Sequence, residues 1–275
     1  MTNSPGSPDS PEPAEATAPG SAAQGPAAQD STVPGSADGT DPNKIPVGAA
    51  TVVLLRDGEL GPEVLLARRN SRLFFAGGAW VFPGGRIDLA DHGDDYPGVP
   101  FDESDARFIE VARRACVREA AEEADALISA DDLVWMSHWT PPMEAPKRFS
   151  TFFFIGPAPA HVLTADGGEI HELAWMSPSE AITRRNTGEI ELIAPTFITL
   201  ALLSRFADTA AALAHHRSHP PEHFVTQFAS ADGTMIAMYD EDAGYETGDA
   251  SVPGPRHRLW MGDGDWVYER SVWPS

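Results

Sequence analysis

Three glutamates close together on one predicted helix are the side chains of this sequence best suited to holding a metal ion. Glu119, Glu122 and Glu123 lie at i, i+3 and i+4, a spacing that brings them to the same side of an α-helix. Like charges at this spacing repel, so they weaken a helix unless a cation lies between them. The cluster is therefore either a solvated acidic face or a cation site, and other segments must decide between the two.

A glycine turn upstream favours the cation site. The peptide FPGG (82–85) ends a predicted strand, and its two glycines let the backbone turn tightly and come close to a ligand. A backbone carbonyl freed at this turn and the carboxylates of the helix are the oxygen ligands that Mg²⁺ and Mn²⁺ prefer. Arg118 precedes Glu122 by four residues, so we expect it to pair with that carboxylate and fix its orientation.

The segments around these residues predict a sheet flanked by helices. Apolar and β-branched runs predict strands at residues 51–55, 63–67, 79–82, 133–136, 149–155 and 169–176. Helices are predicted at about 104–127, from Ser177-Pro178-Ser179-Glu180 onward, and at 195–216. Strands and helices that alternate within one unit predict the α/β (α+β) class, with a mixed β-sheet between helices.

The chain divides into three predicted parts. Residues 1–44 are rich in Pro, Ala, Gly and Ser and bury too little apolar surface to fold, so we predict a disordered tail. Residues 45–216 form the α/β domain. Residues 217–275 contain short strand-like pieces and are predicted to form a C-terminal β extension packed on that domain.

Charge and composition restrict the partners. The formal net charge of -22 argues against nucleic acid and against an anionic membrane surface, whereas a small anionic substrate is compatible if arginines or metal ions offset the repulsion. No apolar run is long enough to span a bilayer, and we expect neither a secretory signal nor a transit peptide at the N-terminus. Cys116 is the single cysteine, which rules out an intrachain disulfide and agrees with a cytoplasmic location.

The turn and the helix together resemble the signature of the Nudix hydrolases. That signature runs Gly, five residues, Glu, seven residues, and then Arg-Glu-apolar-x-Glu-Glu-x-Gly. Its helical part is matched by Arg118, Glu119, Glu122 and Glu123, and its first glycine by Gly85. Three departures are visible: Asp91 replaces the first Glu, Asp125 replaces the last Gly, and residues 92–117 occupy the place of seven. An insertion of this kind costs little entropy, but it leaves open whether Asp91 reaches the metal site.

The resemblance implies an α/β/α sandwich that hydrolyses a diphosphate bond, with Mg²⁺ or Mn²⁺ neutralising charge and activating water. The metal ligands that it implies are Gly84, Glu119, Glu122 and Glu123, and the three glutamates are also the catalytic residues. Arg118 becomes an orienting residue, and Arg69 and Arg148 become candidates for contacts with substrate phosphates. The general base is left open among Glu119, Glu169 and Glu172.

Further segments resemble the branch of this family that contains peroxisomal acyl-CoA and CoA diphosphatases. They are FPGGRIDLAD (82–91), HWTPP (138–142), RFSTFFF (148–154) and the partial CoA-type pattern Leu65, Leu66, Arg69 and Gly78. In that pattern Phe74 stands where a second arginine is usual, with Arg72 nearby. The implied substrate is CoA or acyl-CoA.

Two alternatives to a CoA diphosphatase stay open. The first is a hydrolase of ADP-ribose, NADH or a nucleotide sugar, which would use the same metal ions with a different pocket. The second is a catalytically silent nucleotide-binding module, suggested by the departures at Asp91 and Asp125. In each case the partner is a small molecule that contains a diphosphate, and the oligomeric state is left open between a monomer and a homodimer.

Overall fold

A computed structural model describes residues 46–71, 76–93, 106–143, 145 and 148–273. The predicted tail, together with Arg72 and Phe74, lies outside these residues. Within them, no helix is long and apolar enough to cross a membrane.

The main sheet is mixed, as the sequence predicts. Its described strands follow the order β3-β2-β1-β6-β5-β8, while β4 pairs with β1 and β7 with β2. The strands of this sheet are β1 (Val47–Gly58), β2 (Gly61–Arg69), β3 (Trp80–Val81), β4 (Gly84–Arg86), β5 (Val134–Thr140), β6 (Phe149–Pro157), β7 (Ile170–Met176) and β8 (Glu222–Val225). β1 runs parallel to β6 and antiparallel to β2, which makes the sheet mixed.

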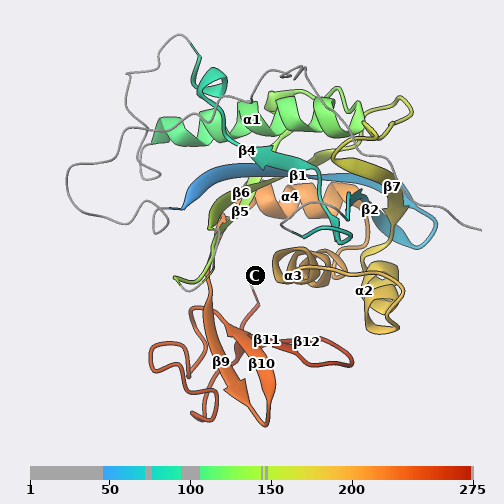
Figure 1. Ribbon diagram of the computed structural model, residues 1–275. Coiled ribbons are helices and arrows are strands. Elements are labelled where there is room, and N and C mark those ends of the chain that lie inside the picture. Colours follow the sequence, from blue (N-terminus) through green and yellow to red (C-terminus); the bar gives the residue numbers. More distant parts are fainter. Residues whose placement is uncertain (1–45, 72–75, 94–105, 144, 146–147, 274–275) are drawn as a thin grey trace, which may run out of the picture. The chain divides into compact units, whose positions relative to one another are not determined.

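Helices cover both faces of this sheet (Figure 1). They are α1 (Ala106–Ala124) on one face, and α2 (Pro178–Asn186), α3 (Ala194–Leu203) and α4 (Thr209–Ser218) on the other. Strand β1 shows why, because successive side chains of a strand point to opposite faces. Val52 and Leu54 pack with α1, whereas Val53 and Leu55 pack with the helices of the second face. The α/β/α sandwich with a mixed sheet is thereby confirmed.

One predicted helix is divided in two. The sequence predicts a single helix over 195–216, but α3 ends at Leu203 and α4 begins at Thr209. Asp208 is the reason, because its side chain accepts a hydrogen bond of 2.7 Å from the Ala211 N–H and so caps a new helix. The Thr209 N–H donates to Asp57 Oδ1 on β1, which fixes the start of α4 against the main sheet.

The C-terminal residues form a second, separate sheet. Its described strands are β9 (Gln227–Ala231), β10 (Thr234–Met238), β11 (His257–Met261) and β12 (Val267–Arg270), in the order β12-β11-β10-β9. β8 belongs instead to the main sheet, where it lies parallel to β5. The chain therefore passes from the main sheet into this second sheet between Val225 and Gln227.

Candidate active site

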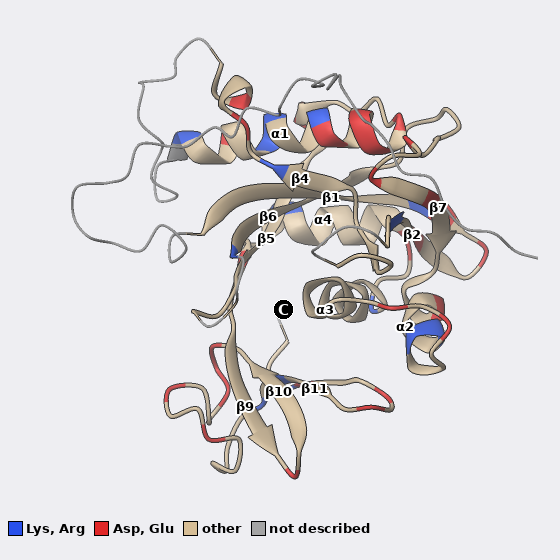
Figure 2. Ribbon diagram, viewed as in Figure 1, with Lys and Arg blue, Asp and Glu red and all other residues tan. Residues whose placement is uncertain are grey.

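Helix α1 carries the three glutamates on its last two turns. Small residues let the helix lie close to the sheet, since Ala112, Ala115 and Ala120 are fully buried beneath it. The carboxylates differ in their surroundings, because Glu123 is 5% exposed whereas Glu122 points into solvent. Acidic and basic positions adjoin on this half of α1 (Figure 2).

The glycine turn lies directly against these carboxylates. Strand β4 pairs with β1, and the Gly84 N–H, opposite Thr51, donates a hydrogen bond of 2.8 Å to Glu123 Oε2. A Cβ at Gly84 would collide with Thr51 and with the backbone of Ala50. A Cβ at Gly85 would collide with the Glu119 carboxylate. Gly84 therefore needs glycine, because the backbone of β1 leaves no room for a side chain, whereas at Gly85 the obstacle is the flexible end of the Glu119 side chain.

Arg118 joins the parts of the site. Its guanidinium makes two hydrogen bonds to Asp91, of 3.0 and 2.9 Å, and further bonds of 2.9 Å to Glu119 and 3.0 Å to Glu122. The hydrogen bonds that Arg118 donates to Asp91 raise the pKa of Arg118. The predicted pairing with Glu122 is present, and the structure adds Asp91 to it.

Asp91 reaches the site despite the insertion that follows it. It lies in the 3₁₀ turn Leu89–His92, is 5% exposed, and accepts from the Asp88 N–H as well as from Arg118. The insertion therefore does not displace this turn from Arg118, and its residues 106–117 form the first turns of α1. Asp91 is linked to Glu119 and Glu122 through Arg118, which it orients.

The departure at Asp125 also has a structural reason. Helix α1 ends at Ala124, and Asp125 takes the left-handed conformation, with φ of 53°. Glycine is favoured at this position for the same reason, and aspartate is one of the few other residues that adopt it readily. The Ala126 N–H then bonds to the carbonyl of Ala120 and closes the helix end. Neither departure from the signature disrupts the site.

A bound cation would lower the electrostatic cost of keeping these buried carboxylates ionised. Burial raises the pKa of Glu123 to about 7, although the Gly84 N–H and Arg69 both lower it. Burial likewise raises the pKa of Glu119, against the effect of Arg118. Oxygen donors with unfavourable negative charge, beside a glycine turn that leaves room for them, fit a hard divalent cation.

The glutamates are at present turned toward protein groups. Arg118 binds Glu119 and Glu122, whereas Glu123 binds Gly84. In this arrangement, no three His, Cys, Asp or Glu side chains among the described residues are placed to share one ion. A metal ion would thus compete with Arg118 for the same oxygens, and ligation by these glutamates and by the Gly84 carbonyl stays a prediction.

The two predicted phosphate-binding arginines have different positions. Arg69 ends β2, lines the cavity beside the glutamates, and pairs with Glu169 at 3.3 Å and with Glu123 at 3.9 Å. Arg148 is instead 8% exposed and donates to the carbonyls of Pro141 and Pro142, each at 3.1 Å. Arg148 is not among the residues that line the cavity, and in the structure it bonds to the backbone of residues 141–142. A contact between Arg148 and a substrate phosphate stays a prediction.

The candidates for the general base are also separated by the structure. Glu119 and Glu169 both line the cavity. Glu172 does not, and it pairs with Arg68 at 3.6 Å on the exposed side of β7. The geometry therefore favours Glu119 or Glu169 over Glu172.

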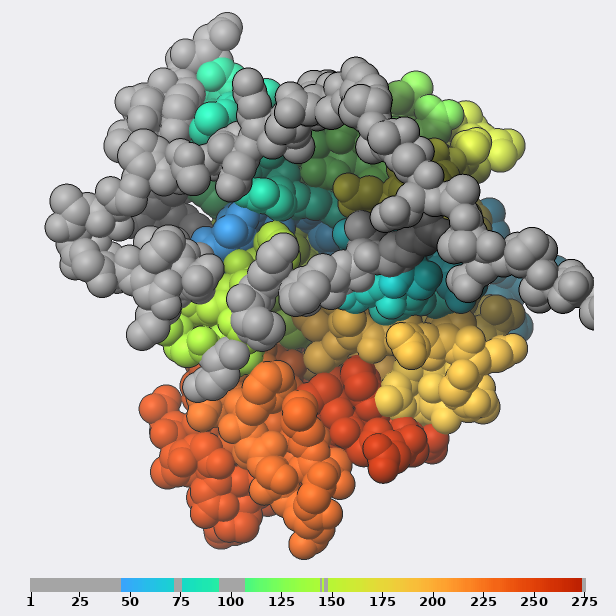
Figure 3. All heavy atoms as spheres, viewed as in Figure 1, coloured from blue at the N-terminus to red at the C-terminus, as the bar shows by residue number. Residues whose placement is uncertain are grey.

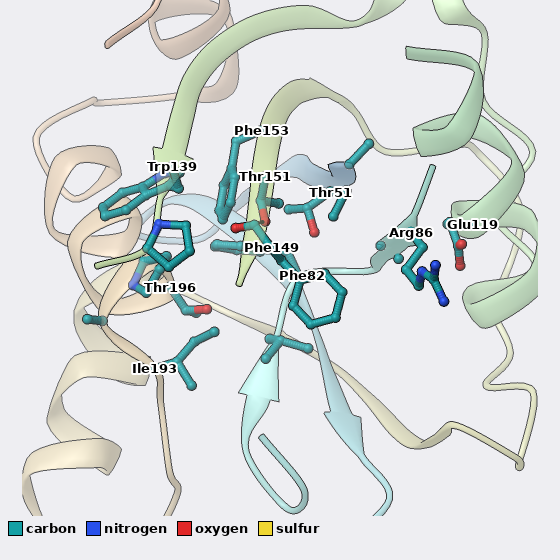
Figure 4. Close-up of a pocket in the computed structure, with 18 of the residues that line it drawn as sticks. Thr51, Phe82, Arg86, Glu119, Trp139, Phe149, Thr151, Phe153, Ile193 and Thr196 are labelled. Carbon is teal, nitrogen blue, oxygen red and sulfur yellow. Dashed lines mark hydrogen bonds between the residues drawn. The ribbon is translucent and has the colours of Figure 1, made fainter. Parts of the chain in front are cut away.

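A cavity of about 870 Å³ extends from Arg69, Glu119 and Glu122 across the sheet. Figure 4 shows Arg86 and Glu119 at one end and Trp139, Ile193 and Thr196 at the other. Between the two ends lie aromatic and hydroxyl side chains: Thr51, Phe82, Phe149, Thr151 and Phe153. The volume of the cavity is in the upper part of the range for small-molecule sites, so the cavity accommodates a substrate larger than the diphosphate alone.

Several of these residues were missed from the sequence. Arg86 follows the glycine turn directly and enters the cavity from β4. Thr51 and Thr151 interrupt apolar runs on the neighbouring strands β1 and β6. Polar residues inside buried strands are a signal that could have identified both. Thr196, on α3, gave no comparable signal because helix faces are set by tertiary packing.

Comparisons with protein families and solved structures show what the chain is similar to. The sequence matches the NUDIX domain over residues 46–195, more than half of the chain. A Nudix hydrolase from Alicyclobacillus acidocaldarius is 22% identical, with a TM-score of 0.53 over 62% of this chain and 96% of that one. A MutT Nudix hydrolase from Burkholderia pseudomallei is 17% identical, with a TM-score of 0.42 over 57% of this chain and 97% of that one. No curated protein matches the chain.

The family match runs from the start of β1 to the start of α3. It includes the glycine turn, the turn of Asp91 and all three glutamates of α1. The chain therefore belongs to the Nudix family and is a pyrophosphohydrolase of nucleoside diphosphate derivatives.

Proposed function

We propose that this protein hydrolyses the diphosphate bond of CoA or of an acyl-CoA, with Mg²⁺ or Mn²⁺ as cofactor. The observation that supports this most is the polarity of the cavity. Every charged side chain that lines it among the described residues belongs to residues 69–122 or is Glu169, whereas the far end is apolar or carries hydroxyls. CoA has the same division, with a diphosphate followed by a long uncharged pantetheine arm.

Divalent ions at this site would neutralise the diphosphate and activate the attacking water, which is the chemistry that the family uses. The protein's own residues have separate tasks around them. Glu119, Glu122 and Glu123 supply the carboxylates that hold the ions. Arg69 and Arg86 lie where the diphosphate would enter, and a guanidinium matches phosphate geometry.

The same metal site would serve ADP-ribose, NADH or a nucleotide sugar. All of these carry a second polar sugar or ring on the far side of the diphosphate. At the far end of the cavity, such a polar group would lose its bound water and contact an apolar wall. Each hydrogen bond that the group then leaves unmade costs free energy of binding. The far end of the cavity thus favours an uncharged, flexible arm over a second ribose.

A substrate panel tests this proposal. We expect purified protein with Mg²⁺ to convert CoA into 3′,5′-ADP and 4′-phosphopantetheine, with kcat/KM for CoA at least about tenfold above that for ADP-ribose and NADH. Removal of the metal with EDTA should abolish turnover, and re-addition of Mg²⁺ should restore it. Product identification by mass spectrometry separates the outcomes, and a preference for ADP-ribose or NADH would contradict the CoA proposal.

A further inference from the structure

Part of the cavity wall lies outside the segment that matches the family. Thr226, Phe228 and Met261 line the cavity, whereas the NUDIX match ends at residue 195. These three residues belong to the C-terminal extension, Phe228 on β9 and Met261 on β11. We call them, together with Trp139, the distal wall. The extension thus contributes to the substrate cavity itself.

The distal wall is tied to the main sheet at a defined place. Trp139 and Phe224 stack with ring centroids 3.9 Å apart and an interplanar angle of 4°, across the parallel pair β5 and β8. One residue after β8, the Thr226 N–H donates a hydrogen bond of 3.1 Å to the Thr140 carbonyl. β9 therefore starts beside the Trp139 end of the cavity, which Figure 4 shows to be opposite Glu119.

The other side of the extension is anchored to α2. The Trp266 N–H donates to Asn186 Oδ1 at 3.1 Å, and Arg185 lies over the Trp266 ring at 4.0 Å from its centroid. In the space-filling view the orange and red residues of the extension lie against the gold residues of the helical segment (Figure 3). These contacts hold the second sheet at the cavity, so its side chains form a fixed wall.

The distal wall has apolar surface that no protein group covers fully. Phe228 is 43% exposed although it lines the cavity. β9 and β10 carry no charged residue, and Figure 2 shows both strands in tan. An apolar ligand group that covers Phe228 and Met261 would gain the free energy of removing both surfaces from water.

We propose that the distal wall is a subsite for the acyl chain of an acyl-CoA. The adenosine half of CoA is the competing occupant, but it carries a 3′-phosphate, and the distal wall offers no cation to pair with it. An acyl chain has no such requirement and matches the apolar side chains. Thr140 and Thr226 also line the cavity, and their hydroxyls are possible partners for the amides of pantetheine. This inference rests on the proposed function and specifies its substrate.

Equilibrium binding in EDTA, where no turnover occurs, tests the subsite separately from the reaction. Titration calorimetry would compare CoA with dodecanoyl-CoA on the wild type and on Phe228→Asp, which adds a carboxylate to the wall. A buried methylene contributes about fourfold in Kd, so we expect dodecanoyl-CoA to bind at least about 30-fold more tightly than CoA to the wild type. In Phe228→Asp this ratio should fall to about threefold or less.

Val267→Asp is the matched control. Val267 is 49% exposed on β12 of the same sheet and does not line the cavity, so this variant should keep the wild-type ratio. Met261→Ser provides a second test of the wall, with an expected intermediate ratio. Circular dichroism melts establish that each variant is folded.

The outcomes separate the inference from the proposed function. Equal Kd values for CoA and dodecanoyl-CoA on the wild type, or an unchanged ratio in Phe228→Asp, would overturn the acyl subsite while leaving CoA hydrolysis intact. A ratio that responds to Phe228→Asp, combined with no CoA cleavage in Mg²⁺, would support the subsite and contradict the proposed reaction. Weaker binding of 3′,5′-ADP to Phe228→Asp would assign the wall to the nucleoside and overturn the inference.

Discussion

Glu123→Gln is expected to lower kcat/KM by roughly 10²- to 10³-fold and at the same time to stabilise the metal-free protein at pH 8. Activity falls because an amide cannot supply the negative charge that a divalent cation needs. Stability rises because burial raises the pKa of Glu123 from 4.5 to about 7, so the folded state disfavours its ionised form. The amide oxygen still accepts the Gly84 N–H.

The size of the stability change depends on pH. A carboxyl whose folded pKa is raised destabilises the fold progressively as pH rises from 4.5 to about 7, and the full cost is present above that range. A shift of this size corresponds to on the order of 3 kcal/mol. We therefore expect Glu123→Gln to gain stability at pH 8 and to gain little at pH 4.

Urea unfolding in EDTA at the two pH values measures this effect. Glu122→Gln is the matched control, because Glu122 is on the same helix turn but exposed, and it should show no comparable gain at pH 8. A Glu123→Gln protein that is destabilised equally at both pH values would contradict the account of this carboxylate.

Replacing Arg118 by alanine is the second change with a large expected effect. It removes the partner of buried Asp91 and the cation between Glu119 and Glu122. We expect the free energy of unfolding to fall by about 1–3 kcal/mol, because among the described residues the Asp91 carboxylate then keeps a single donor, the Asp88 N–H. We expect kcat/KM to fall by about 10- to 100-fold, the usual effect of losing a group that orients metal ligands.

Arg114→Ala separates the two contributions. Arg114 lies one turn earlier on α1 and donates to the backbone carbonyls of Asp91 and His92, and it bonds to no carboxylate among the described residues. It should therefore cost stability and leave kcat/KM within about threefold of the wild type. Steady-state kinetics and urea unfolding on both variants make the comparison, and equal losses of activity in the two would contradict an orienting role for Arg118.

The sequence was sufficient where local spacing determines geometry. The three glutamates follow from helical periodicity, and Arg118 reaches Glu122 because four residues make one turn. Ser177 caps α2 as predicted, since the capping signal is contained in four consecutive residues. The apolar runs at 51–55, 63–67 and 149–155 likewise predict β1, β2 and β6, because continuous apolar runs are typical of strands that are buried on both faces.

The remaining parts depend on contacts between distant segments. Asp91 contacts Arg118 although the insertion separates them in the sequence, and no local sequence pattern predicts this contact. Arg148 is predicted to contact a phosphate because its side chain suits one, whereas its burial against Pro141 and Pro142 is a tertiary fact. The strands β8 and β9 were not predicted, because β8 is defined by its pairing with β5 rather than by its own composition.

Titration of Mn²⁺ into the metal-free protein, followed by electron paramagnetic resonance of the free ion, tests the central claim most directly. That claim is that Glu119, Glu122 and Glu123 jointly hold a divalent cation beside the glycine turn. The account predicts that the wild type removes Mn²⁺ from solution and that the variant with glutamine at all three positions, folded by circular dichroism, does not. Equal Mn²⁺ binding by the two proteins, or none by the wild type, would contradict it.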